Sequence, residues 1–212
     1  YSDDEMRKIR AEEQRQAARI GQYSFVAQLG HPSSQCKNEN HRSPLSQDLL
    51  SILESTTPEV IYTHNPFDKH PTHLGVLLAT LDAIAHLPPE SKPKRVYGCE
   101  VWRGVDWLPD DVKVVHDVSP HPDLAISLNE VFHSQIGGGK RYDLAVEGRR
   151  RANATFYQAH SIDGCDRVQY AIDLTDLTAS GEPVHRFADR VLDQFRDEVL
   201  SELPTRCQKA DH

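Results

Sequence analysis

The chain has 212 residues and a formal net charge of −8, and 38% of its residues are hydrophobic. This length fits one domain with a core of ordinary size. The acidic balance argues against a nucleic-acid partner, whose phosphates would be repelled, and no apolar run reaches the roughly 18 residues of a membrane span. The four cysteines, at positions 36, 99, 165 and 207, form no C-x-x-C pair. We therefore expect a protein of the reducing cytoplasm.

The first predicted element is a helix over residues 6–21, where apolar side chains recur every three or four positions. Asp3 and Asp4 precede it, and acids at this place are typical of a helix N-terminus. The chain opens on Tyr1 rather than on a methionine. We therefore expect that a segment upstream of this sequence is missing.

The rest of the chain alternates strands with helices. We predict strands over 23–26, 60–63, 95–101 and 112–117, and helices over 46–55, 73–86, 123–132, 146–158 and 187–200. This alternation predicts an α/β fold of the Rossmann-like kind, a largely parallel sheet flanked by helices. No repeat or low-complexity segment divides it, so we expect a single domain over residues 1–212.

The stretch THNPFDKHPTH, residues 63–73, follows the strand predicted over 60–63. In open α/β sheets, ligands bind beyond the carboxyl ends of the strands, so a site is expected at this loop. His73 begins a rigid helix and can ligate zinc, whereas His70 stands just before that helix and can act on a substrate. Asp68 can hydrogen-bond an imidazole and fix its tautomer.

The string PEVIYTHNPFDKHPTH resembles the second signature of the LmbE/PIG-L family of zinc-dependent N-deacetylases, a strand followed by D-x-H-P-x-H. The stretch RKIRAEEQRQAARIG is similar to the R-x-x-E-x-x-x-A-A helix of that family. Three further stretches, VWRGVDWLPDD, HSQIGGGKRYD and GRRRANATF, resemble segments of its C-terminal half and occur in the same order. The resemblance thus extends over nearly the whole chain.

This resemblance implies a zinc-dependent amidohydrolase that removes the N-acetyl group from an amino-sugar conjugate of the N-acetylglucosaminyl type. It implies that His73 is a zinc ligand and that His70, with Asp68, serves catalysis by stabilising the oxyanion or protonating the leaving amine. Arg10 is implied to organise the substrate side of the pocket. The expected partner is therefore a small amino-sugar conjugate, while the oligomeric state stays open.

The chain departs from the family in one respect, because the signature A-H-P-D-D-E is not found in it. In the family that signature supplies two zinc ligands and the general base. Neither Asp3 with Asp4 nor His121 with Asp123 replaces it, since both pairs suit helix starts. We therefore expect a LmbE-like sheet without its first strand or strands, and a chain that alone binds zinc weakly and is inactive.

Two alternatives stay open: a non-catalytic sugar-binding or structural remnant of the family, and an α/β hydrolase that uses the loop without metal. His64 is interpreted as a loop residue or a support for a ligand rather than a ligand itself, and Trp102 and Trp107 as packing or pocket-wall residues rather than sugar-stacking ones. Ser134 lacks the strand-turn-helix setting of a nucleophile. The three glycines at 137–139 lack nucleotide-binding spacing, and we expect a flexible loop near the site.

Overall fold

The computed structural model describes residues 2–206, so Tyr1 and Cys207 lie outside the described residues. The chain divides into two compact units, which are described separately. The first unit comprises Tyr1–Gly30 and His116–Gln169, and the second comprises His31–Val115 and the chain from Tyr170 onward. The single domain expected over residues 1–212 stays a prediction.

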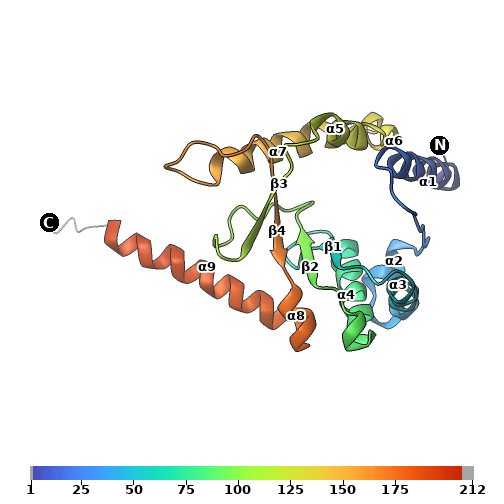
Figure 1. The fold of residues 1–212 in the computed structure, drawn as a ribbon, viewed down its shortest axis with the longest axis horizontal. Coiled ribbons are helices and arrows are strands. Elements are labelled where there is room, and N and C mark those ends of the chain that lie inside the picture. The colour runs from blue at the N-terminus through green and yellow to red at the C-terminus, as the bar shows by residue number, and fades with distance from the viewer. Residues whose placement is uncertain (1, 207–212) are drawn as a thin grey trace. The chain divides into compact units, whose positions relative to one another are not determined.

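The second unit contains most of the sheet and the helices that pack on it (Figure 1). Its helical elements are α2 (Ser33–Lys37), η1 (Glu39–His41), α3 (Ser43–Thr56), α4 (Pro71–His86), η2 (Pro89–Ser91), α8 (Thr175–Ser180) and α9 (Val184–Arg206). Its strands are β1 (Val60–His64) and β2 (Arg95–Cys99), and most of β3 (Lys113–Asp117) and β4 (Val168–Asp173) also belongs to it.

The four-stranded sheet has the order β1-β2-β4-β3. β1 and β2 are parallel and in register from Val60 opposite Arg95 to His64 opposite Cys99, whereas β4 runs antiparallel to β2. The mixed α/β fold with flanking helices is therefore confirmed. The sheet is less parallel than expected because it contains the antiparallel strand β4, which was not among the predicted strands. Its buried alternate residues, Val168, Tyr170 and Ile172, were the available signal.

One predicted strand is not formed, and another lies at the edge of the sheet. The strand predicted over 23–26 is wrong, because these residues pair with no strand in the described chain, and the side chains of Tyr23 and Phe25 are more than half exposed. β1 lies at one edge of the sheet, and its residues Val60 and Tyr62 are exposed.

Helix α4 is the centre of the second unit, with contacts to α2, α3, β1 and α8. Pro71 occupies its first turn, where a missing N–H costs nothing. Leu77, Ala79, Ala83 and Ile84 are almost completely buried, because neighbours surround the helix on several sides.

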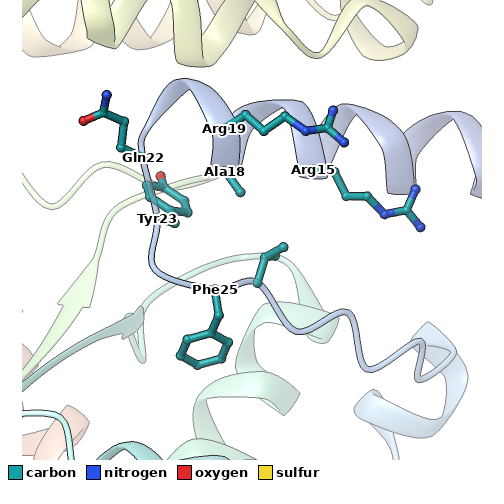
Figure 2. A pocket seen from close by; sticks show the side chains of 7 residues that line it. Arg15, Ala18, Arg19, Gln22, Tyr23 and Phe25 are labelled. Atoms are coloured by element: carbon teal, nitrogen blue, oxygen red, sulfur yellow. The ribbon is translucent and has the colours of Figure 1, made fainter.

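The first unit is helical and comprises α1 (Asp3–Ile20), α5 (Pro122–Glu130), α6 (His133–Gly137) and α7 (Tyr142–Phe156). Ser2 and Glu5 form a capping box at the start of α1, and Asp3 and Asp4 lie in its first turn. The helix-start interpretation of these two aspartates is therefore confirmed. Figure 2 shows the end of α1 and the extended segment after it, which together line a pocket of about 340 Å³.

The close approach of α2 to α4 depends on Gly75, because a Cβ atom there would lie 2.1 Å from the carbonyl oxygen of Cys36. We expect Gly75→Ala to lower the free energy of unfolding by roughly 1–3 kcal/mol, the usual cost of overpacking, as measured by urea denaturation. Gly148→Ala is the matched control, because no atom lies within 4 Å of the added Cβ on α7. Alanine there should stabilise by up to about 1 kcal/mol. Equal stability of the two variants would contradict the packing assignment.

Candidate functional site

The candidate site lies where β1 and β2 end. Because the two strands are parallel and in register at His64 and Cys99, their carboxyl ends meet at one edge of the sheet. The loop from Asn65 to His70 leaves β1 there, and the loop from Glu100 to Trp107 leaves β2 beside it. Ligands of open α/β sheets bind at such an edge.

Asp68 connects the two loops. Its carboxylate is fully buried and accepts the His70 backbone N–H at 2.8 Å, the His73 Nδ1–H at 3.0 Å and the Trp102 backbone N–H at 3.4 Å. Burial by itself would raise the pKa of Asp68, but the hydrogen bonds from the His73 ring and the backbone outweigh it and hold the pKa below its usual value. Asp68 is therefore an ionised acceptor that ties three segments together.

The bond to Asp68 assigns the tautomer of His73. An ionised carboxylate can only accept a hydrogen bond, so Nδ1 of His73 carries the proton. Its Nε2 then keeps a free lone pair, the form in which histidine binds a metal. The structure thus pairs Asp68 with the ring of His73, whereas His70 contributes its backbone N–H to the same carboxylate.

His70 is the N-cap of α4, and its Nδ1 accepts the backbone N–H of Thr72 at 3.3 Å. A neutral imidazole has one N–H, so the proton of His70 lies on Nε2, which makes that atom a donor. The ring stacks at 4.6 Å from the ring of His73 and at 6.1 Å from Trp102. The hydroxyl of Thr72 hydrogen-bonds to that of Ser33 at 2.6 Å.

His64, the last residue of β1, lies against this group. Its ring stacks on that of His73 with a centroid distance of 4.0 Å and an angle of 6°. Burial is the main cause that lowers the pKa of His64 from 6.5 to about 4. His64 is therefore neutral at pH 7 and has a lone pair available for a metal.

His64, Asp68 and His73 each offer one ligand atom, and these atoms lie within 4.8 Å of one another. Two nitrogen ligands of one zinc ion lie at most about 4.2 Å apart, because each bond is about 2.1 Å long. The set could therefore hold a metal ion such as zinc only after its side chains move closer together. One imidazole must also turn, because two parallel stacked rings cannot both hold an ion in their planes. Sequence analysis did not foresee His64 in this set.

Two buried polar residues that sequence analysis did not single out support the site. Asn65 is completely buried, donates to the Cys99 carbonyl at 2.8 Å and accepts the Phe67 N–H at 2.8 Å. Glu100 accepts the backbone N–H groups of Val105 at 3.0 Å and Tyr170 at 3.4 Å. Each of these residues directly follows a strand. A polar residue at that position in the sequence was the signal that could have predicted its place at the site.

The two tryptophans of the second loop differ in their surroundings. The indole N–H of Trp107 donates to the Gly104 carbonyl at 2.9 Å, and its ring packs edge-on against Phe67 and Phe195. Its interpretation as a packing residue is confirmed. Trp102 is partly exposed and stands beside His70 as a wall of the site.

The other residues singled out in the sequence belong to the first unit. Arg10 is exposed on α1, and its substrate-binding role stays a prediction. His121 and Asp123 occupy the N-cap and first turn of α5, which confirms their interpretation as a helix start. The hydroxyl of Ser134 donates to the buried carboxylate of Glu13 at 2.7 Å. Both residues are thereby engaged in joining α6 to α1.

Residues 1–84 match the PIG-L family, described as GlcNAc-PI de-N-acetylase. The resemblance to the LmbE/PIG-L family is thus confirmed over this segment. The fold is similar to the crystal structure of the conserved protein TT1542 from Thermus thermophilus, with a TM-score of 0.60 and 20% sequence identity. The likeness covers 78% of this chain and 73% of that chain. No curated protein matches the chain significantly.

The family match supports an enzyme of the deacetylase type. None of the helices within residues 2–206 is long and apolar enough to cross a membrane. Cys36, Cys99 and Cys165 are free thiols, and burial raises the pKa of the Cys99 thiol to about 11, so that it stays protonated beside the site.

The depressed pKa of His64 predicts a pH-dependent stability. The unfolded chain binds this proton near pH 6.5 and the folded chain only near pH 4, so the stability that neutral His64 allows is complete above pH 6.5 and is lost as the pH falls towards 4. We expect the free energy of unfolding of the metal-free protein to fall less steeply over this range in His64→Gln than in the wild type. The difference in slope is at most about 1.4 kcal/mol per pH unit.

Urea denaturation at several pH values in the presence of a chelator measures this difference. His41→Gln removes an exposed histidine of the same unit and serves as the control. Identical slopes for the wild type and His64→Gln would contradict the assignment of a buried, neutral His64.

Proposed function

We propose that this protein is a zinc-dependent N-deacetylase that hydrolyses the linear amide of an N-acetylated amino-sugar conjugate. The observation that carries the proposal is the arrangement around Asp68, which leaves Nε2 of His73 as an acceptor beside a donating Nε2 of His70. An acceptor for a metal next to a donor for an oxyanion is what amide hydrolysis by a metal centre requires. The description of the PIG-L family supports the deacetylase class.

Zinc is the metal that fits the donor set. His73 would hold it through Nε2, His64 would add a second imidazole after turning out of the stack, and Asp68 would act mainly through the ring of His73, since both of its oxygens already accept N–H groups. When bound, zinc lowers the pKa of a coordinated water towards ~7 and polarises the amide carbonyl.

His70 supplies the donor for the reaction. Its Nε2–H can donate to the carbonyl oxygen of the substrate as that oxygen gains negative charge. The bond from Thr72 N–H to Nδ1 fixes both the tautomer and the direction of the ring, so little reorganisation is needed when the charge develops. Asp68 is a positioning residue, because it orients His73 and holds the backbone of His70.

A non-catalytic sugar-binding role is the second candidate. The observation that favours it is the parallel stack of His64 on His73, because in this arrangement only one of the two rings can hold an ion. Zinc content and acetate release separate the two candidates. Stoichiometric zinc with acetate release from N-acetylglucosamine conjugates supports the deacetylase, whereas sugar binding without either supports the second role.

In a form of the protein that binds zinc, we expect His73→Ala to reduce the zinc content to background, because the variant loses the imidazole that Asp68 orients. Asp68→Asn should weaken zinc affinity by roughly 10–100-fold, the usual effect of removing a carboxylate behind a ligating histidine. Metal analysis and competition with a chelator measure both effects, with His41→Gln as the control. Wild-type zinc occupancy in His73→Ala would remove His73 from the metal site.

In a form of the protein that binds zinc and releases acetate, we expect His70→Ala to keep the zinc but to lower kcat by roughly 10²–10³, the usual effect of losing one transition-state donor. Acetate release is the measurement, and circular dichroism checks that α4 still forms without its N-cap. An unchanged kcat in a folded, zinc-loaded variant would exclude His70 from the reaction.

A further inference from the structure

A cleft of about 400 Å³ lies on the first unit, between the end of β3 and the helices α5 and α7. All of its lining residues fall within 117–150, so they belong to one unit and lie outside the segment that matches the PIG-L family. A cleft of this volume is large enough for a small organic molecule. It also follows a strand directly, as ligand sites of α/β folds commonly do.

One face of α5 forms the apolar floor of the cleft. Leu124, Ala125 and Leu128 line it, and their spacing of three and four residues places them on the same side of the helix. His121, the N-cap of α5, lies on this side one turn earlier. Leu124 is exposed, so a ligand can reach the apolar floor and bury a small aliphatic group against it.

Two opposite charges line the cleft together with this floor, Asp117 at the end of β3 and Arg150 on α7. Hydrogen bonding with the side chain and the backbone N–H of Ser119 holds the pKa of Asp117 below its usual value, so the carboxylate is ionised at pH 7. Arg150 is half-buried, and its Nε donates to the side-chain oxygen of Gln169 at 3.4 Å. The cleft therefore combines one anion, one cation and an apolar floor.

We propose that this cleft binds a small zwitterion with an apolar side chain, the chemical form of a free branched-chain amino acid. The carboxylate of the ligand pairs with the guanidinium of Arg150, which is suited to bind a carboxylate through parallel hydrogen bonds. The ammonium of the ligand pairs with the carboxylate of Asp117, and its side chain packs on Leu124 and Leu128.

Ligands with a single charge fit the same cleft less well. An aliphatic carboxylate would meet the like charge of Asp117, and an aliphatic amine would meet that of Arg150. A zwitterion offers each of these groups the opposite charge. Because it has no net charge, it is also not repelled at long range by a chain whose net charge is −8.

Isothermal titration calorimetry on the full chain tests the proposal with four probes that differ by one group each. L-leucine has both charges and the apolar side chain, isocaproate lacks the ammonium, isopentylamine lacks the carboxylate, and L-alanine lacks most of the side chain. We expect L-leucine to bind roughly tenfold or more tightly than either singly charged probe, the usual effect of one charge-assisted hydrogen bond. It should also bind more tightly than L-alanine, because it buries more apolar surface.

Variants of the lining residues assign each group of the ligand to its partner. Asp117→Asn should weaken binding of L-leucine by roughly tenfold without weakening binding of isocaproate, which has no ammonium. Arg150→Gln should weaken binding of L-leucine without weakening binding of isopentylamine, which has no carboxylate. Leu128→Ala should reduce the preference for L-leucine over L-alanine. A variant that merely fails to fold would lose all probes together, so these selective losses distinguish recognition from instability.

Arg7→Gln is the matched control, because it removes an exposed cation of the same unit that pairs only with Asp4 on the surface of α1. It should leave the affinities for all four probes unchanged. Backbone amide chemical shifts locate the site, and the changes caused by L-leucine should be confined to residues 117–129 and the neighbourhood of Arg150. The absence of saturable leucine binding, equal affinity for L-leucine and isocaproate, or shift changes elsewhere would overturn the proposal.

Discussion

The buried carboxylate of Asp68 is the constraint on which the rest of the site depends. A charged group without exposure to water is stable only when donors surround it, and here the donors come from three separate places: the ring of His73 and the backbones of His70 and Trp102. The same bonds fix the loop after β1, the start of α4 and the loop after β2. They also decide which nitrogen of His73 is free.

The parallel pairing of β1 with β2 makes this arrangement possible. Their carboxyl ends meet at His64 and Cys99, so both loops begin side by side and a single carboxylate can reach them. Asn65 continues this connection by bonding to the Cys99 carbonyl. The apolar helix α4 then holds His73 and the cap His70 on a rigid element, because its inner face is buried in the second unit.

In this site, the roles of hydrogen-bond acceptor and donor belong to different histidines. The histidines keep complementary nitrogens, with an acceptor on His73 and a donor on His70. The neutral state of His64 follows from its burial against His73. The acceptor lies on α4 and the donor lies at the N-cap of the same helix.

The sequence by itself determined the α/β class, the helix that begins near His73 and the loop that holds the site, because these depend on local periodicity and on the position of polar residues after a strand. The resemblance to the family came from short motifs, each of which is contiguous in the sequence. Only the tertiary structure decided that Asp68 bonds to the ring of His73, that His64 joins this group and that β4 runs antiparallel to β2. These contacts link residues through side-chain direction and strand pairing, which spacing along one chain does not specify.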